Sequence, residues 1–478
     1  MSENSFARRV ASSVLYSGAA SVTARLLNAG ALFYTLKVIS EEQFGIAALA
    51  LAFFSTTKAL TELGLGTALI QEKRIGRIQV DSLFWTSFLL SVVVYALIYL
   101  TAPFVANFYD TPVLSSMIRV YMIAIIAFSF YMISSKLLMR DLEFKKLAIS
   151  DNVALASSAA LMIYLAYAGW GAWAIILAEL ANKIGQMAFS MLYKPYFPRF
   201  QYSYKQVKHL IEFGLYTTGS NFFQKFYMNA DYLIIGKFFS MELVGIYSFA
   251  YRLVFDTVKE LANVINRVAY PAFAKLQFDN PRLRNYFFTM SRASMLLVGT
   301  VMVIIGTYID WFLPLVGYEK WMDAVPYIRI FVAVGIFQCL VTLLPKLINA
   351  KGKAKFIFYY MSANALLLPV GFLITAQYSM MAVALVWLTI YPLASIVIIY
   401  FGAKLTETNV WTFAFKSIAA FATLIPLAGF AYAVRYAITY TMGEANVLSV
   451  ALASLFVFSV TAVVIWFKEK DAIQAIRK

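Results

Sequence analysis

The sequence predicts an all-α polytopic membrane protein with about fourteen transmembrane helices. Three observations support this fold class: long apolar segments, short connections between them, and basic residues on every second connection. Each segment is long enough to cross about 30 Å of hydrocarbon, which takes ~20 apolar residues in a helix. In chain order, the segments lie at about 10–36, 44–70, 80–105, 115–135, 147–168, 170–192, 210–234, 243–264, 287–312, 326–348, 357–377, 380–402, 411–434 and 446–467.

The composition agrees with this fold class and excludes an ordinary soluble globule. Hydrophobic residues make up 62% of the chain, and charged residues only 13%. The formal net charge is +16, but the basic residues are spread along short connections. We therefore expect contact with anionic membrane lipids and not with nucleic acid. The single cysteine, Cys339, lies inside an apolar segment and predicts no disulfide.

Basic residues also predict how the segments are oriented. One set of connections carries the basic clusters around Arg8, Arg74, Arg140, Lys194, Arg284, Lys353 and Lys468. The alternate connections hold little beyond Lys37, Lys237, Lys320 and Arg435. Because positively charged connections stay on the cytoplasmic side of a membrane, we expect an even number of spans with the N- and C-termini in the cytoplasm.

The chain matches itself at an offset of 200 residues. Nine identities lie between residues 15 and 57, where about three are expected by chance. They include Lys37, Ser40, Glu42 and Gly45, which match Lys237, Ser240, Glu242 and Gly245. Both copies enter the membrane in the same direction, which predicts two parallel six-helix bundles related by a pseudo-two-fold axis. We place the bundles at 1–200 and 201–404, followed by two additional transmembrane helices and a cytoplasmic tail at 405–478.

Residues for enzyme catalysis are scarce. The chain has one histidine, His209, and one cysteine, so its apolar segments offer neither a His/Cys metal cluster nor a His-based catalytic triad. It has no P-loop, HExxH or Gly-rich nucleotide motif. We therefore expect no metal, no cofactor and no enzyme activity, and an ATP-driven pump is excluded for this chain acting alone.

Ionisable side chains inside the apolar segments predict a central cationic cavity. Such a side chain at the bilayer centre costs about 2.5–3.5 kcal/mol on insertion scales, so it usually faces the bundle interior or water. Arg25 and Lys225 are equivalent in the repeat, so a pseudo-two-fold axis would bring both near the centre. The predicted substrate-binding residues are Arg25, Asn28, Lys58, Lys225, Asn229 and Arg252, because Arg, Lys and amide groups suit an anionic ligand.

Carboxylates inside the segments predict sites of energy coupling. Intramembrane carboxylates are the usual carriers of protons or sodium ions in proteins without a nucleotide site. The candidates are Glu62, Glu179, Asp231 and Asp256. Asp231 lies six residues from Lys225, roughly 9 Å along a helix axis, which is long for a direct ion pair.

Structural roles remain open for the same charged residues. Lys58 and Glu62 are four residues apart and suit a neutralising pair on one helix face. Glu179 and Lys183 have the same spacing and also suit an internal ion pair. The eighth segment carries charges toward its basic end, where a solvated helix face explains them equally well. These are Arg252, Asp256, Lys259 and Glu260.

Six stretches resemble the Wzx-type polysaccharide flippases of the multidrug/oligosaccharidyl-lipid/polysaccharide exporter superfamily, particularly the colanic-acid-exporter branch. They are Phe44–Ala47, Glu62–Gln71, Arg140–Lys145, Gly169–Trp173, Asn229–Lys237 and Tyr270–Phe273. The order and spacing of the stretches carry the resemblance, which covers essentially the whole chain. It implies a flippase that moves undecaprenyl-pyrophosphate-linked oligosaccharide repeat units from the cytoplasmic to the periplasmic leaflet of the bacterial inner membrane. It also implies a polysaccharide polymerase and glycosyltransferases as partners.

We expect the two bundles to work by alternating access, with two other function classes still open. One is a small-molecule or drug/cation antiporter of the same superfamily, which would need an acidic cavity, whereas basic residues prevail in the first, second and seventh segments. The other is a membrane-embedded glycan polymerase or glycosyltransferase. Large outward loops or an Asp-rich metal motif would favour that class, and the sequence has neither.

Overall fold

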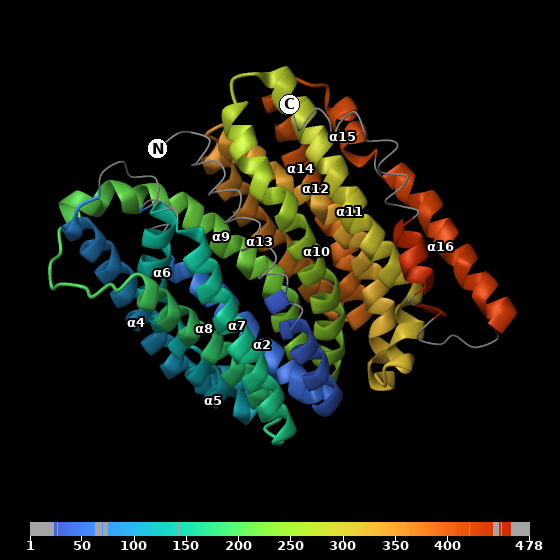
Figure 1. The fold of residues 1–478 in the computed structure, drawn as a ribbon, viewed down its shortest axis with the longest axis horizontal. Helices are drawn as coiled ribbons and strands as arrows, with labels where there is room; N and C mark the ends of the chain where they lie inside the picture. The colour runs from blue at the N-terminus through green and yellow to red at the C-terminus, as the bar shows by residue number, and fades with distance from the viewer. Residues whose placement is uncertain are drawn as a thin grey trace. The chain divides into compact units, whose positions relative to one another are not determined.

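The computed structural model describes residues 23–25, 27–62, 69, 75–141, 143–419, 421–442, 449–450 and 452–459, and the regular structure in these residues is helical (Figure 1). The predicted all-α fold class is confirmed. Much of the predicted segments 10–36 and 446–467 lies outside the described residues, as does most of the stretch Glu62–Gln71. The chain divides into two compact units, residues 1–245 and 246–478.

The first unit is a bundle of mostly long helices. Its elements are α2 (Glu41–Thr61), α4 (Arg77–Phe108), α5 (Pro112–Tyr121), α6 (Ile123–Arg140), α7 (Phe144–Tyr167), α8 (Ala172–Tyr193), α9 (Tyr204–Phe238) and the start of α10 (Met241–Lys275). Helices α7 and α8 pack along each other, α8 also packs against α6, and α9 packs against α2. Four of these helices, α2, α6, α7 and α8, position the candidate site described below.

Helix α2 begins with a complete capping box. The Ser40 hydroxyl accepts a hydrogen bond from the backbone N–H of Gln43, and the Gln43 side chain accepts one from the backbone N–H of Ser40. Two of the N–H groups that every helix leaves unpaired at its start are thereby satisfied. Glu41 and Glu42 in the first turn suit the positive end of the helix dipole.

Two equivalent glycines bring α2 into backbone contact with the start of α10 inside the first unit. A Cβ atom added to Gly45 would lie 2.0 Å from the carbonyl oxygen of Met241. A Cβ atom added to Gly245 would lie 1.9 Å from the carbonyl oxygen of Glu41. Both positions therefore require glycine for this close approach, and they are the pair that the 200-residue offset aligns.

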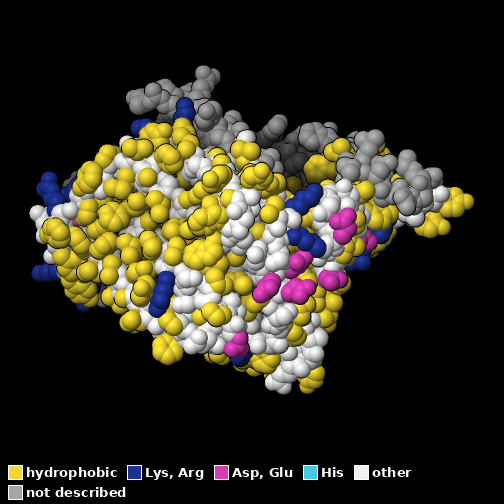
Figure 2. Space-filling model, turned by 90° about the horizontal axis from the view of Figure 1, so that it is seen from below, with side chains coloured by type: hydrophobic (Ala, Val, Ile, Leu, Met, Phe, Trp, Pro, Cys, Tyr) yellow, Lys and Arg dark blue, Asp and Glu magenta, His cyan; other side chains and the backbone are white. Residues whose placement is uncertain are grey.

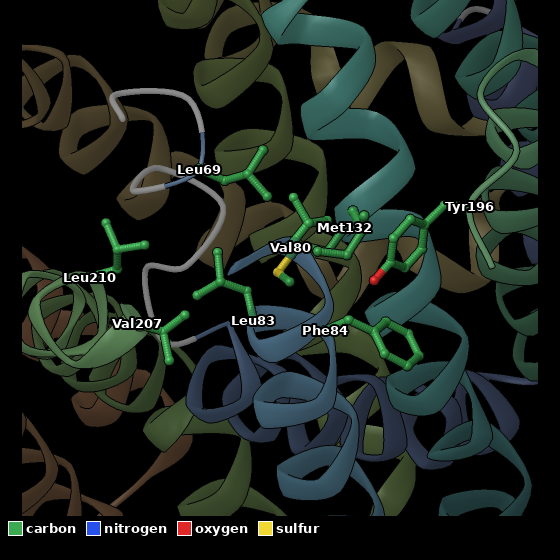
Figure 3. Packing of buried hydrophobic residues seen from close by; sticks show 9 residues of the cluster. Leu69, Val80, Leu83, Phe84, Met132, Tyr196, Val207 and Leu210 are labelled. Atoms are coloured by element: carbon green, nitrogen blue, oxygen red, sulfur yellow. The ribbon is translucent and has the colours of Figure 1, made fainter. Parts of the chain in front are cut away.

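An apolar cluster packs next to the basic connections of the first unit. Leu83, Phe84, Met132, Ile133 and Tyr196 are buried there, together with Leu69, Val80, Val207 and Leu210 (Figure 3). The chain after α8 returns across α4, where the Trp85 indole N–H donates to the carbonyl of Arg199 at 2.8 Å. The cluster fixes the ends of α4, α6 and α9 that border the basic connections.

The second unit contains the rest of α10 and the helices that follow. They are α11 (Asn280–Leu315), η1 (Glu319–Ala324), α12 (Val325–Ala350), α13 (Ala354–Ala376), α14 (Met380–Leu405), α15 (Val410–Ile418) and α16 (Phe421–Met442). Its core holds a chain of aromatic rings. The ring centroid of Phe255 lies 5.3 Å from that of Phe331 and 5.9 Å from that of Trp387, and Phe372 contacts Trp387 at 5.5 Å.

The described residues contain nine helices that are long and apolar enough to span a membrane. They are Glu41–Thr61, Arg77–Phe108, Pro112–Arg140, Phe144–Tyr167, Asn280–Leu315, Glu319–Ala350, Ala354–Ala376, Met380–Leu405 and Val410–Tyr440. Hydrophobic side chains cover much of the face drawn in Figure 2. The chain is therefore a multi-pass membrane protein. Helices α8, α9 and α10, with 22, 35 and 35 residues, are not among these nine. They carry many of the charged residues predicted to form the site.

Candidate functional site

Three lysines and two carboxylates of the first unit, on or at the ends of helices α2, α6, α7 and α8, lie within electrostatic range of one another. Lys58 lies in the last turn of α2, and its Nζ is 3.2 Å from the Glu62 carboxylate. The predicted pairing of these two residues is confirmed. Both side chains remain accessible, with 28% of Lys58 and 38% of Glu62 exposed. The ammonium also lies 4.1 Å from the centre of the Phe128 ring, a cation–π contact.

The second lysine of this group, Lys136, comes from α6. Its ammonium lies within electrostatic range of both Glu62 and Asp151. Asp151, on α7, accepts a hydrogen bond from the Tyr131 hydroxyl at 3.0 Å. Neither Lys136 nor Asp151 was predicted as a site residue, because both stand close to the basic connection between segments and suit solvated helix ends in the sequence.

The third lysine, Lys183, comes from α8 and is half-buried. It lies within electrostatic range of both Lys58 and Asp151. Within the described residues, no ion pair joins Lys183 to Glu179, so the internal pair that their spacing suggests is not formed. We call Lys58, Glu62, Lys136, Asp151 and Lys183 the lysine cluster.

The lysine cluster has an excess of positive charge, and its side chains are partly exposed. Its three ammonium groups face two carboxylates, and only one lysine–carboxylate distance within it, between Lys58 and Glu62, is short enough for a direct ion pair in the described residues. Lysine ammonium groups each offer three donors and suit phosphate oxygens as compact point charges. The arrangement can therefore bind an anion with several oxygen atoms.

The predicted residues on α9 differ in their contacts and in their burial. The Asn229 side-chain amide donates to Ser55 and Thr56 of α2, at 3.3 Å each, and to the carbonyl of Lys225 at 2.6 Å. Asn229 thus joins α9 to α2, a packing role that its sequence position did not reveal. Asp231 is fully buried, and its carboxylate accepts from the backbone N–H of Tyr232 at 2.9 Å. Lys225 is half-buried.

The other predicted residues are spread over both units. Arg25 is exposed and Asn28 half-buried on the short helical stretch before α2. In the second unit, Arg252 pairs with Asp256 on α10, with 3.5 Å between Nε and the carboxylate, and more than half of the Asp256 side chain is exposed. Arg252 itself is half-buried, so both a solvated helix face and a substrate contact stay open for this pair. The roles of Arg25, Asn28, Lys225, Asp231 and Glu179 stay predictions.

A second polar region of the first unit lies at the opposite end of α2. It is a cavity of about 380 Å³ lined by Glu42, Tyr109, Asp110, Lys237 and Glu242 among others. Here acidic groups outnumber the lysine, whose Nζ is 3.6 Å from Asp110 and donates to the carbonyl of Phe108 at 2.7 Å. This cavity is therefore less suited to an anion than the lysine cluster is.

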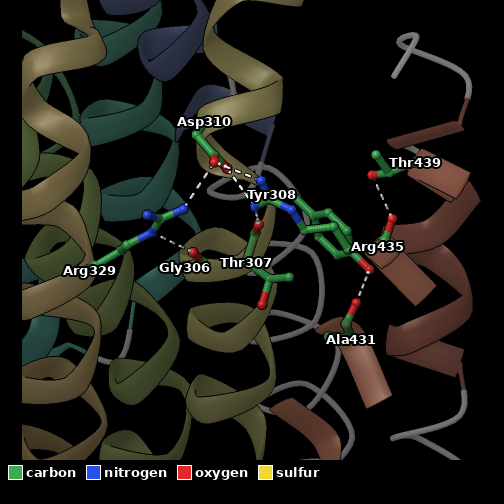
Figure 4. Close-up of polar contacts among 8 residues, drawn as sticks. All are labelled: Gly306, Thr307, Tyr308, Asp310, Arg329, Ala431, Arg435 and Thr439. Carbon is green, nitrogen blue, oxygen red and sulfur yellow. Dashed lines mark hydrogen bonds and ion pairs between the residues drawn. The ribbon is translucent and has the colours of Figure 1, made fainter. Parts of the chain in front are cut away.

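An ionic cluster that was not predicted from the sequence lies in the second unit. The Arg435 guanidinium of α16 binds both carboxylate oxygens of Asp310 on α11, at 2.8 Å each, and also donates to the carbonyl of Thr307 (Figure 4). Arg329 of α12 binds Asp310 at 3.0 Å. The Arg435 guanidinium also lies 4.7 Å from the centre of the Trp311 ring. We call these residues the arginine clamp, because they tie α16 to α11.

Comparison with known proteins identifies the family. The model of the family described as "Polysaccharide biosynthesis protein" matches residues 37–326. Teichuronic acid biosynthesis protein TuaB of Bacillus subtilis (strain 168) is 28% identical over 311 residues, covering 64% of this chain and 64% of that protein. Lipopolysaccharide biosynthesis protein WzxC of Escherichia coli (strain K12) is 23% identical over 326 residues, covering 68% and 66%. Each match thus spans just under two thirds of the relative's length.

Solved structures show the same fold at low identity. A lipid II flippase MurJ in an inward closed conformation superposes with a TM-score of 0.69 at 14% identity, covering 96% of this chain and all of that one. An inward-facing multidrug resistance MATE family transporter of the MOP superfamily gives a TM-score of 0.64 at 15% identity, covering 80% and 94%. The Wzx-type resemblance is confirmed, and the chain belongs to the polysaccharide biosynthesis protein family.

Proposed function

We propose that this protein is a flippase for oligosaccharide linked to undecaprenyl pyrophosphate, and that the lysine cluster binds the pyrophosphate. The relatives named above belong to polysaccharide biosynthesis, and one more, ExoT of Rhizobium meliloti (strain 1021), is called a succinoglycan biosynthesis transport protein. A carrier lipid of this kind presents two linked phosphates, each with one negative charge. The observation that carries the proposal is the group of three half-buried lysines facing only two carboxylates.

The chemistry of the cluster suits this headgroup better than a cationic solute. A cation would meet net repulsion from three ammonium groups, whereas a diphosphate gains charge-assisted hydrogen bonds from them. Lys58 is held by Glu62 and Phe128, so its ammonium is positioned before a ligand arrives. Lys136 and Lys183 approach from two further helices, which lets them contact different oxygens of the same ligand.

The wider mechanism belongs to the same proposal. We propose fourteen spans with both termini in the cytoplasm, two parallel six-helix bundles with two added helices, and transport by alternating access from the cytoplasmic to the periplasmic leaflet. The bundle boundaries near residues 200 and 404, and a central cavity that adds Arg25, Lys225 and Arg252 to the substrate contacts, remain predictions. So does ion coupling through Glu62, Glu179, Asp231 or Asp256. A polysaccharide polymerase and glycosyltransferases are the proposed protein partners.

The test is flipping by proteoliposomes that contain a defined undecaprenyl-pyrophosphate oligosaccharide. We expect the native protein to expose the glycan on the opposite leaflet, and Lys136→Gln and Lys183→Gln to lower the rate about tenfold or more each, since a charge-assisted hydrogen bond contributes ~1.5–3 kcal/mol. Lys194→Gln is the matched control, because Lys194 pairs with Asp141 at 2.6 Å outside the cluster. It should flip at the native rate.

Two results would contradict the proposal. If folded Lys136→Gln and Lys183→Gln proteins both flip at the native rate, the lysine cluster does not bind the headgroup. If the native protein moves no glycan but exchanges a cationic dye for protons, the protein is a small-solute antiporter and not a flippase.

A further inference from the structure

Asp151 is the carboxylate of the lysine cluster whose charge depends most on its neighbours. Helix α7, which carries it, packs against α6 and α8. From α6 it meets the Tyr131 hydroxyl at 3.0 Å and, at longer range, Lys136; from α8 it meets Lys183 at longer range. In the described residues, its one direct side-chain contact is thus a neutral phenol. On its own helix, Lys146 already pairs with Glu143 at 3.1 Å.

Glu62, the other carboxylate, is placed differently. It contacts Lys58 directly at 3.2 Å, and more than a third of its side chain is exposed to solvent. Glu62 is therefore both directly paired and in contact with solvent. Asp151 is half-buried and has no directly bonded lysine in the described residues. The countercharges near it are Lys136 and Lys183, the two lysines that a bound diphosphate would also engage.

The net charge of the lysine cluster changes sign when a diphosphate binds. With all groups ionised, three lysines and two carboxylates leave one positive charge. A diphosphate diester with two negative charges turns this into one negative charge. Inside a membrane protein an uncompensated charge is costly, and the cost is usually avoided by binding or losing a proton. One proton on Asp151 makes the occupied cluster neutral.

We propose that Asp151 takes up a proton when the diphosphate binds and returns it when the diphosphate leaves. This inference rests on the proposed function, because the diphosphate is what draws Lys136 and Lys183 away from the carboxylate. The proton comes from solvent, no covalent bond of the lipid is broken, and Tyr131 keeps the carboxyl group in place in both states. Transport would then respond to pH through a residue that is not among the coupling residues predicted from the sequence.

The test counts protons released or bound during titration calorimetry of the whole protein in detergent micelles. The probe is a short-chain prenyl diphosphoryl hexose, whose two phosphates are already diesters and do not titrate near neutral pH. Measuring the binding enthalpy in buffers of different ionisation enthalpy gives the number of protons taken up. We expect about one proton per bound probe for the native protein and less than about a fifth of a proton for Asp151→Asn.

Asp141→Asn is the matched control, since Asp141 is a solvent-exposed carboxylate of the same unit that pairs with Lys194. It should take up protons as the native protein does. Unchanged proton uptake in a folded Asp151→Asn protein overturns the inference alone, and so does binding by the native protein without uptake. If the native protein does not bind the probe, the proposed function fails, and this inference fails with it.

Discussion

The lysine cluster of the first unit and the arginine clamp of the second unit contain similar groups but bond them differently. In the clamp, one carboxylate is saturated: Arg435 holds both oxygens of Asp310 at 2.8 Å, and Arg329 adds a third contact at 3.0 Å. In the lysine cluster, two carboxylates share three lysines with one direct ion pair among the described contacts. Charges that are fully bonded to each other stabilise the fold, whereas charges left under-bonded remain available to a ligand.

The difference in bonding also distinguishes arginine from lysine, two basic residues that a count of charges in the sequence treats alike. Arg435 presents a planar fork that fits a carboxylate with two parallel hydrogen bonds, so it is committed to Asp310. Lysines act as flexible point charges and can exchange one partner for another. We therefore expect substitutions in the clamp to change stability, and substitutions in the lysine cluster to change binding and transport.

Asp310→Asn should break the clamp and have the largest effect on stability. It removes the charge that holds two arginines, and we expect the second unit to lose about 3 kcal/mol, since both guanidinium groups stay partly buried without a counter-ion. The measurement is thermal unfolding in detergent. Asp279→Asn on the same helix is the control, because Asp279 is an exposed cap that asparagine can replace. Equal melting temperatures for the two variants would show that the clamp has no structural role.

A pair of double-mutant cycles sharpens the comparison. For Asp310 and Arg435 we expect a coupling free energy of about 2 kcal/mol, because the bidentate pair is only about one-fifth exposed. For Lys58 and Glu62 we expect less than about 1 kcal/mol, because that single contact is more exposed. Each cycle uses unfolding of the single and double alanine variants. Similar coupling energies would mean that the two clusters do not differ in bonding.

Within the clamp, Arg329→Gln should cost less than Asp310→Asn does. The Arg329 side chain is 44% exposed and makes one contact with the carboxylate, so we expect a loss of about 1 kcal/mol. The same thermal unfolding experiment measures it. A loss as large as that of Asp310→Asn would make Arg329, and not Arg435, the main partner of the carboxylate.

A directly bonded cluster also exists in the first unit, and it gives the smallest predicted effect. Tyr196, which is buried, donates to the Asp81 carboxylate at 2.7 Å, and Arg77 binds the same carboxylate at 3.3 Å. Burial, and then the hydrogen bond to Asp81, raises the pKa of Tyr196 above its usual value. The folded protein therefore keeps this proton above about pH 10, where an unfolded tyrosine loses it.

The stabilisation from Tyr196 is thus present below about pH 10 and declines as the pH rises further. Tyr196→Phe should lower stability by about 1 kcal/mol at neutral pH and remove part of the decline at high pH. Unfolding measured between pH 8 and pH 11 checks this. Parallel pH profiles for the native and Tyr196→Phe proteins would rule out the proposed contribution.

Much of the fold was predictable because the length of a hydrophobic segment directly indicates whether it can span a membrane as a helix. The segment predicted at 326–348 is α12, Val325–Ala350, and the one at 170–192 is α8, Ala172–Tyr193. Helix ends were less predictable. The segment predicted at 243–264 continues in α10 to Lys275, because a helix keeps its own hydrogen bonds after it leaves the hydrocarbon, so hydropathy does not mark its end.

The candidate site was predictable only where its residues are close in sequence. The spacing of Lys58 and Glu62 revealed that pair, but Lys136, Asp151 and Lys183 join it through the packing of three other helices. The same limit hid Asp310, whose partner Arg435 is 125 residues away. Contacts between helices depend on which helix faces pack together, and a single sequence taken alone contains no direct record of that.

The paired glycines of α2 and α10 have a consequence for the origin of the chain. Gly45 contacts the backbone of Met241, and Gly245 contacts the backbone of Glu41. Because Glu41 and Met241 are themselves equivalent at the 200-residue offset, the two contacts are the same contact made in both directions. Reciprocal contacts of this type are the mark of a two-fold dimer interface between identical subunits. A half-length ancestor could have met a second copy of itself through a single glycine. After duplication and fusion, the two copies of that glycine would each become irreplaceable on their own.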